Sequence, residues 1–186
     1  MGKALIIFLI VLGTLLVAGV SLAMGFIGFQ NTCKDFEIQI EAQYTDNQNV
    51  YDNGYKEVLE KSQVPKMYTN QLKELYAGAM SGRYGEEGSQ ALFQFIQEQN
   101  PALDPEIFRQ IQQSIETFRR RFTQAQRELV SKKQAYQRYY AATTSGRFYN
   151  MLRGYPKADM GRYDIVTSGR TEETFSTKKD EPLNLK

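Results

Sequence analysis

The sequence predicts an all-α membrane protein, with a single N-terminal transmembrane helix followed by an elongated antiparallel helical bundle. Three observations predict this class. An uncharged apolar run stands near the N-terminus, apolar residues recur at helical spacing through most of the remaining chain, and only residues 163–167 look like a strand. We therefore expect a transmembrane anchor at 1–30, a helical bundle domain at 31–156 and a polar C-terminal tail at 157–186, extended or poorly ordered.

The anchor is predicted from an uncharged run of 26 residues, Ala4 to Phe29. About 20 apolar residues suffice to cross a bilayer. The alternative is a cleaved signal peptide, with Lys3 as its positive start and Ser21-Leu22-Ala23 as the cleavage site. The apolar run is longer than the roughly 7–15 residues of a signal core and continues past that site, which favours an uncleaved anchor. The first predicted partner is thus the lipid bilayer, contacted by residues 4–29 of a single-pass membrane protein.

Small residues in the anchor offer a route to self-association. Gly19 with Ala23, and Ser21 with Gly25, are four residues apart, the spacing that lets two membrane helices approach closely. Such residues are also common in single anchors. A homo-oligomer is therefore one possible partner, next to a different protein.

The first helix beyond the anchor is predicted from about residue 36 to Ser62. Its apolar positions follow one helical stripe, and Asn47 occupies the expected position between two tyrosines of that stripe. The stripe consists of Phe36, Ile40, Tyr44, Tyr51, Tyr55, Val58 and Leu59. Val64-Pro65 should end the helix, because the residue before a proline is pushed out of the helical region. This helix can be continuous with the anchor.

Two shorter helices are predicted next. One covers about 66–80, with Leu72, Leu75 and Tyr76 facing inward, and it ends in a glycine-rich stretch that we expect to be a mobile loop. The other is short and ends at Asn100-Pro101. Its apolar residues are Leu92, Phe93, Phe95 and Ile96.

The longest helix is predicted from Pro105 to about Tyr140. Asp104 is a good N-cap, and proline fits the first helical position, whose amide has no helical partner. The inward positions alternate steps of three and four, with a break near Lys132 and Lys133. They are Ile107, Ile111, Ile115, Phe118, Phe122, Ala125, Leu129, Tyr136 and Tyr140. A helix of this length must pack along the first one, which gives the antiparallel bundle.

Charge is divided unevenly along the chain. Residues 34–100 contain 6 Lys/Arg and 11 Asp/Glu, whereas residues 101–162 contain 12 and 5. One interpretation is that an acidic first helix packs beside a basic long helix, with charges paired across the seam. The other is that the basic residues bind anionic lipid headgroups or an acidic partner. These residues are Arg119, Arg120, Arg121, Arg127, Lys132 and Lys133.

Two further arguments limit that second interpretation. Consecutive arginines 119–121 spread over about 200° of a helix, so they cannot all serve one face. With a net charge of +2, the chain also lacks the broad basic footprint that phosphate contacts require. We expect no nucleic-acid partner.

The sequence offers little for catalysis. Cys33 is the only cysteine and histidine is absent, which excludes an internal disulfide and argues against a zinc site. The glycine-rich residues 79–85 follow no strand and lack the Gly-Lys-Ser/Thr of a phosphate-binding loop. Ser131 and Lys132 are helical neighbours whose side chains point about 100° apart and cannot share a proton. The adjacent carboxylates at 86–87 and 172–173 have no apolar pocket indicated nearby.

We therefore predict no enzyme: no catalytic residue, no cofactor-binding or metal site, and no small-molecule substrate. Tyrosines at 136, 139, 140 and 149 form a possible sticky surface. Two of the four continue the stripe of the long helix, so a place in the core explains them equally well.

Several motifs resemble the LemA family of bacterial membrane proteins. Phe26-Ile27-Gly28-Phe29-Gln30-Asn31 resembles that family's exit from the anchor. Residues 98–103, Glu-Gln-Asn-Pro-Ala-Leu, resemble its Glu-x-Tyr-Pro-x-Leu turn, and Phe108, Ile111, Gln112 and Ile115 fit the following Phe-x-x-Leu-Gln-x-x-Leu. Leu129-Val130 and Tyr136-Gln137 depart from its usual Tyr-Asn, Arg119 stands in place of Glu, and Thr143-Thr144 replaces Phe-Pro. The chain is similar to a divergent member.

The resemblance implies one anchor, a helical bundle on the cytoplasmic side, and no established enzymatic activity. Our functional hypothesis is a membrane-anchored helical scaffold or adaptor of the LemA type, presenting helix faces to a protein partner or to itself. The alternative is a helical component of an envelope or lysis apparatus on the extracytoplasmic side. Lys3 and Lys34 flank the anchor equally, so the positive-inside rule gives a tie. The resemblance, and a basic helix beside an anionic inner leaflet, favour the cytoplasm.

Overall fold

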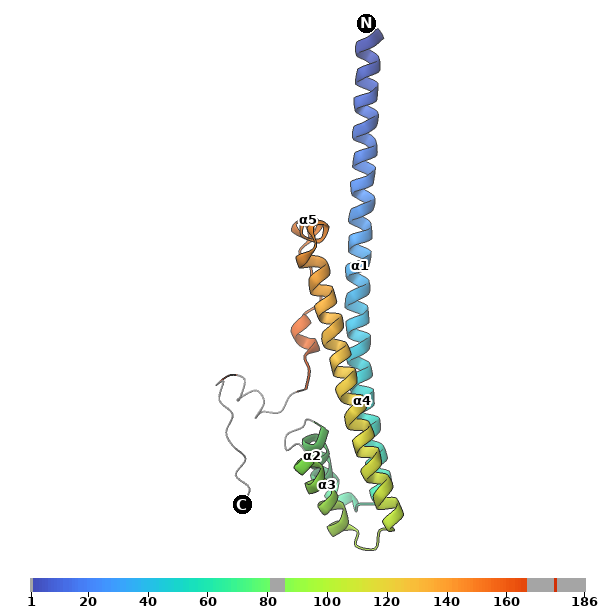
Figure 1. Ribbon diagram of the computed structural model, residues 1–186, viewed down its shortest axis with the longest axis vertical. Helices are drawn as coiled ribbons and strands as arrows, with labels where there is room; N and C mark the ends of the chain where they lie inside the picture. Colours follow the sequence, from blue (N-terminus) through green and yellow to red (C-terminus); the bar gives the residue numbers. More distant parts are fainter. Residues whose placement is uncertain (1, 81–85, 167–175, 177–186) are drawn as a thin grey trace. The chain divides into compact units, whose positions relative to one another are not determined.

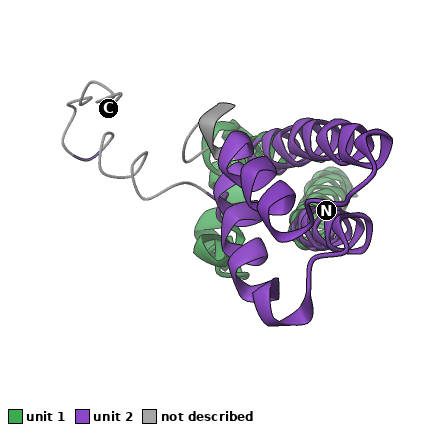
Figure 2. Ribbon diagram, turned by 90° about the horizontal axis from the view of Figure 1, so that it is seen from below, with its two compact units in different colours: residues 1–41, 131–163 green, residues 42–130, 164–186 purple. Residues whose placement is uncertain are grey.

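A computed structural model describes residues 2–80, 86–166 and 176 of the chain (Figure 1). Every regular element within this described part is a helix, which confirms the all-α class. The chain divides into two compact units (Figure 2). Unit 1 contains residues 1–41 and 131–163, and unit 2 contains residues 42–130 and 164–186. These units cut across the predicted anchor, bundle and tail ranges.

The helices follow the predicted order, with two additions. They are α1 (Gly2–Ser62), η1 (Lys66–Tyr68), α2 (Thr69–Met80), α3 (Glu86–Gln99), α4 (Pro105–Gln137), η2 (Arg138–Ala142), α5 (Thr144–Arg153) and η3 (Met160–Tyr163). The predicted end at Ser62 and the predicted start at Pro105 are confirmed. The backbone N–H of Glu106 donates to Asp104 Oδ1 at 2.7 Å, so Asp104 caps α4 as expected. The additions are α5 and the short η3, neither of which was predicted from the sequence.

Helix α1 contains the one candidate membrane span among the described residues. It is 61 residues long, and its most apolar 18-residue window has a mean hydropathy of 2.8 with no residue buried. A core helix of a soluble protein of similar hydropathy would be mostly buried. One helix of this chain is therefore long and apolar enough to cross a membrane, and it continues without interruption into the predicted first helix of the soluble part.

In unit 1, aromatic side chains join α1 to the end of α4, to η2 and to α5. The Phe36 ring stacks on Tyr136 with centroids 5.5 Å apart, and the Phe29 ring stacks on Tyr139 at 5.6 Å. Cys33 lies one turn from each phenylalanine and is fully buried. Tyr136 is buried as its place on the predicted stripe requires. The core of unit 1 thus begins at Phe29, seven residues earlier than the predicted stripe.

The predicted tail needs a correction at its start. A single oxygen of Glu37, on α1, accepts hydrogen bonds from the backbone N–H groups of Lys157 (2.6 Å) and Ala158 (3.2 Å) and from the Tyr136 hydroxyl (2.7 Å). Tyr163 is only 5% exposed at the end of η3. Residues 157–163 are therefore packed against helices, because a carboxylate and a buried aromatic ring hold them. Residues 163–166 form no strand, and residue 167 and most of the tail lie outside the described residues.

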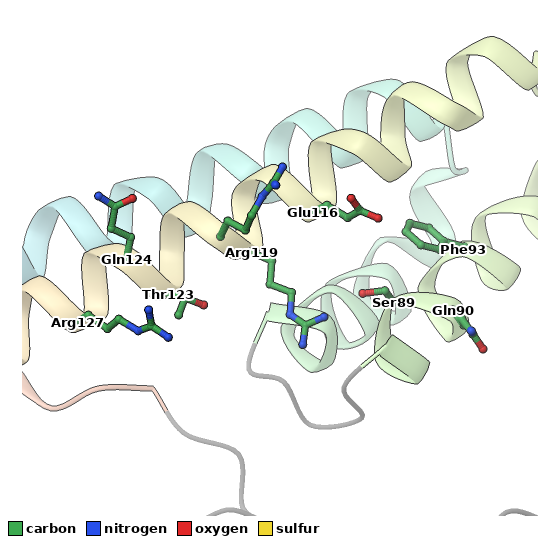
Figure 3. A pocket seen from close by; sticks show the side chains of 9 residues that line it. Ser89, Gln90, Phe93, Glu116, Arg119, Thr123, Gln124 and Arg127 are labelled. Carbon is green, nitrogen blue, oxygen red and sulfur yellow. The ribbon is translucent and has the colours of Figure 1, made fainter.

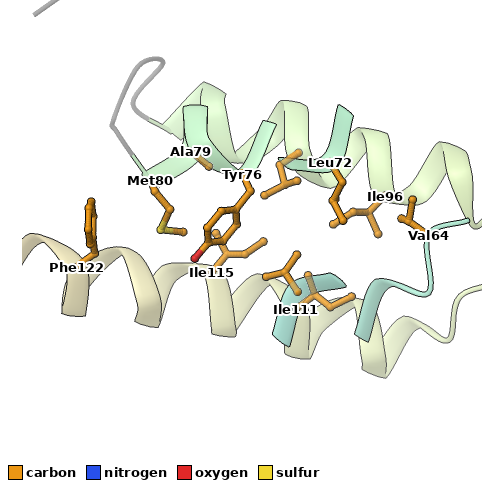
Figure 4. Packing of buried hydrophobic residues seen from close by; sticks show 11 residues of the cluster. Val64, Leu72, Tyr76, Ala79, Met80, Ile96, Ile111, Ile115 and Phe122 are labelled. Carbon is orange, nitrogen blue, oxygen red and sulfur yellow. The ribbon is translucent and has the colours of Figure 1, made fainter. Parts of the chain in front are cut away.

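The main hydrophobic core belongs to unit 2 (Figure 4). It gathers side chains of α1, α2, α3 and α4, as the inward positions of all four predicted helices require. The cluster consists of Val58, Val64, Leu72, Tyr76, Ala79, Met80, Leu92, Ile96, Ile111, Ile115 and Phe122. At about 25 cal/mol per Å² of apolar surface buried, such a cluster supplies the main driving force for folding this unit.

Two positions of α1 in unit 2 allow close helix packing. Asn47 is 5% exposed, and with its amide nitrogen turned inward it donates to the backbone carbonyls of Gln43 (3.0 Å) and Ala125 (3.1 Å). This polar bond between α1 and α4 fixes their register, in the manner of a buried asparagine in a coiled coil. At Gly54 the absent side chain leaves room for the Tyr76 hydroxyl and the Phe118 ring.

Candidate functional site

The candidate site is an open groove of about 860 Å³ between α3 and α4 in unit 2 (Figure 3). Three arginines and one glutamate give its described lining a net positive charge. The lining consists of Ser89, Gln90 and Phe93 from α3, and of Glu116, Arg119, Arg120, Thr123, Gln124 and Arg127 from α4. Residues on α4 spaced by three, four and seven share one helix face, which explains why these side chains converge.

The arginine run divides between two sides of α4, as its helical spread predicts. Arg119 and Arg120 line the groove together with Arg127. The Arg121 guanidinium instead lies 5.9 Å from the centre of the Phe118 ring, and its charge acts on Glu57 of α1. Guanidinium groups present several N–H donors in a plane that matches a carboxylate or phosphate. The groove is thus chemically suited to an anionic group.

A second, smaller hollow of about 380 Å³ adjoins the groove along α4. The two hollows share Arg119, Thr123 and Arg127. Its other lining residues are mostly apolar and include Met80, Val130, Ile165 and Val166. The backbone N–H of Val166 donates to Gln126 Oε1 at 3.0 Å, which ties residues 165–166 to α4. A segment lying along this face would meet both guanidinium groups and apolar contacts.

The polar seam between α1 and α4 is centred on Glu57. Ser114 Oγ donates to Glu57 Oε1 at 2.8 Å, and Lys61 Nζ donates to the same oxygen at 2.7 Å. These hydrogen bonds, with the positive charges of Lys61 and Arg121, lower the pKa of Glu57. The predicted attraction between an acidic α1 and a basic α4 is present at this point. The ion pairs Lys56–Asp52, Lys61–Glu57 and Arg109–Glu106 each lie within one helix.

The other residues considered for a functional role from the sequence contact neighbouring parts of the chain, are exposed, or lie outside the described part. Lys133 Nζ donates to the Tyr163 carbonyl at 2.9 Å, and Lys132 is half-buried. Ser131 is exposed on the helix beside it. Tyr149 packs against Gly25, so one of the small residues proposed for self-association meets a side chain of the same chain. The glycine-rich residues 81–85, the side chains at 86–87 and residues 172–173 lie outside the described part.

Two features of the site were not predicted from the sequence. Phe93 was predicted only as an apolar residue of the third helix; it packs against the core of unit 2 and also lines the groove. Ser89 was not considered. The helical spacing of 116, 120, 123 and 127 opposite the apolar stripe was a usable signal for the α4 wall. Among the described residues, no group of three or more His, Cys, Asp or Glu side chains is placed to hold a metal ion.

Comparison of the chain with models of protein families, with curated proteins and with solved structures finds no match. The similarity to LemA proteins therefore rests on the motifs alone and remains a prediction.

Proposed function

We propose that this chain is a non-catalytic, membrane-anchored scaffold of the LemA type. Residues 4–29 of α1 cross the bilayer, and the remaining helices form an elongated antiparallel bundle that presents helix faces to a protein partner. The observation that carries this proposal is α1 itself. Its apolar window is wholly exposed, while the same helix goes on to contribute Cys33, Ile40 and Val58 to buried positions. Lipid is the environment that accounts for so much uncovered apolar surface on an otherwise well-packed chain.

The face that we assign to the partner is the arginine-lined groove, and the ligand is an acidic segment of a protein. Arg119, Arg120 and Arg127 supply the positive charge, and the apolar hollow next to them accommodates the hydrophobic residues that flank such a segment. Charge complementarity of this kind speeds association and selects partners. Homo-oligomers form through the same groove only if an acidic segment of a second copy enters it.

Site-specific photo-crosslinking in cells tests the assignment of the groove. A photoreactive amino acid replaces Gln124, which lines the groove, or Gln113, which is exposed on α4 outside it. We expect a discrete covalent complex from position 124 and none from position 113. The combined change Arg120→Ala and Arg127→Ala should abolish that complex, whereas Arg121→Ala should preserve it. Equal capture from both positions, or capture that ignores the arginines, contradicts the proposal.

We further propose that the soluble part faces the cytoplasm, which a cysteine-labelling experiment tests. The variant combines Cys33→Ser with Gln113→Cys, because Gln113 is exposed on α4. Intact cells are treated with a membrane-impermeant maleimide. Protection until lysis is expected. Labelling in cells with a sealed inner membrane would place the domain outside and favour the envelope or lysis apparatus instead.

A further inference from the structure

Helix α5 packs onto the end of the apolar segment in unit 1. The Tyr149 ring lies 6.1 Å from Phe26 and 5.7 Å from Phe29, measured between centroids, and the Tyr149 hydroxyl touches the position where Gly25 lacks a side chain. In Figure 1, α5 runs across α1 rather than along it. A Cβ at position 25 would collide with the Tyr149 hydroxyl, so the absent side chain of Gly25 permits this close approach.

The same helix leaves an apolar stripe uncovered. Phe148, Met151 and Leu152 are 51%, 78% and 61% exposed, and their spacing of three and four residues puts them on one side of α5. Beyond residue 29, the described part exposes seven large hydrophobic side chains, and three of them are these. A soluble surface seldom concentrates apolar side chains in this way without a partner.

Basic side chains flank the stripe at the same level. The Arg153 guanidinium lies 6.0 Å from the centre of the Phe26 ring, and Arg147 Nε donates to the Ala141 carbonyl at 2.9 Å. Apolar residues on one face with arginines beside them are typical of helices that lie in the plane of a membrane surface. Tyrosines such as Tyr149 and Tyr155 are enriched at the same depth of a bilayer.

We propose that α5 is an interfacial helix, whose Phe148, Met151 and Leu152 enter the acyl edge of the bilayer crossed by residues 4–29. Arg147 and Arg153 then meet anionic lipid headgroups. The depth of α5 in the bilayer fits this role. Its contact residue Gly25 lies four residues before the end of the apolar run, which is about 6 Å at 1.5 Å per residue. Interfacial helices bury their apolar face by a similar depth, about 5–10 Å. Because the exposed stripe of α5 lies next to the apolar segment of α1, lipid rather than a second copy or another protein is the molecule that covers it. This inference rests on the proposed membrane anchor.

Single-tryptophan variants of the full chain test the inference, since the natural sequence contains no tryptophan. Met151→Trp probes α5, and Met67→Trp is the matched control, because both methionines are 78% exposed. Leu16→Trp marks the membrane span. Each variant is reconstituted into vesicles of phosphatidylcholine and phosphatidylglycerol, with or without bromine on the phosphatidylcholine acyl chains. Brominated lipid should quench the fluorescence of Leu16→Trp and Met151→Trp several-fold and leave Met67→Trp nearly unchanged.

The outcomes separate the two proposals. If Leu16→Trp is quenched and Met151→Trp is not, the interfacial helix is refuted while the anchor stands. If Leu16→Trp is not quenched, the anchor fails and the inference fails with it. Equal quenching of Met67→Trp would overturn the assignment to α5.

A second measurement removes the influence of the introduced indole, which itself prefers membrane interfaces. Adding Phe148→Ser and Leu152→Ser to Met151→Trp deletes two members of the native stripe, with helix content checked by circular dichroism. Quenching should fall markedly. Unchanged quenching would mean that the native stripe does not hold α5 in the bilayer, which refutes the proposal.

Discussion

Replacing Gly54 by alanine would insert a methyl group among the packed helices of unit 2. The new Cβ would collide with the Tyr76 hydroxyl and lie 2.8 Å from Phe118 Cγ. Tyr76 is fully buried, and its hydroxyl donates to the Tyr51 carbonyl at 3.3 Å, so the ring has little room to retreat. Phe118 is only partly buried and can shift more easily.

Two opposing effects set the magnitude of Gly54→Ala. Alanine gains about 1 kcal/mol over glycine in a helix interior. Overpacking a filled core costs about 1–3 kcal/mol. We therefore expect a net loss of about 1 kcal/mol in the free energy of unfolding. The adjacent Asn53 is exposed, so Asn53→Ala has the propensity gain without the collision and should stabilise by about 0.5 kcal/mol.

Denaturant titration of the full chain in mild detergent, followed by circular dichroism, measures both changes. Tyr76→Phe removes the nearest colliding atom, so Gly54→Ala should cost less in that background than in the natural one. Such a difference is a coupling energy between two residues in contact. If Gly54→Ala stabilises the chain as much as Asn53→Ala does, the helices do not approach each other at Gly54 and the reasoning is wrong.

Three other substitutions or titrations test the packing. Phe122→Glu should lower the free energy of unfolding by at least about 3 kcal/mol, since Phe122 is 3% exposed. Arg120→Glu should change it by less than about 0.5 kcal/mol, because the Arg120 side chain is exposed. Equal melting temperatures for the two variants would contradict this expectation. Burial and the nearby Glu37 charge raise the pKa of Cys33 to about 11, so folding favours the neutral thiol. The resulting contribution to folding stability is present below pH 9 and is lost as pH rises through about 11. Near pH 8, the Cys33 thiol should react with a disulfide reagent at least ~100-fold more slowly than in the denatured chain. Equal reaction rates in the folded and denatured chains would refute this burial of Cys33. Asp104→Ala should cost about 1 kcal/mol by removing the α4 cap, and an unchanged unfolding midpoint would show that the cap contributes nothing.

Helix boundaries that depend on local chemistry were predictable from the sequence. Val64-Pro65 ends α1 because proline constrains the residue before it, and Asp104-Pro105 begins α4 because both residues suit a helix start. The signals for α5 are also local, although they were not used. Thr143 accepts a hydrogen bond from the Gly146 N–H as an N-cap, and Gly154 ends the helix with a φ of 64°. A search for caps alone would have found α5.

One contact between distant parts of the chain left no trace in the sequence pattern. Glu37 and Lys157 are 120 residues apart, and no periodicity indicates that one carboxylate gathers two backbone amides of the predicted tail. Cys33 is different. It continues the spacing of Phe29, Phe36 and Ile40, so extending the stripe toward the N-terminus would have predicted its burial. The stripe was begun too late because Phe29 had been assigned to the anchor.

The distribution of arginines on α4 separates structural from functional charge. Attraction between the acidic and basic halves of the chain accounts for Arg121, which acts on Glu57 of α1. It does not account for Arg120 and Arg127, which line the opposite, α3 side of α4. There the side chains that α3 contributes to the described lining are Ser, Gln and Phe, none of them acidic, and Glu116 supplies the single carboxylate. The described lining of the groove thus carries three guanidinium groups and one carboxylate, and this excess of positive charge supports the proposed acidic partner.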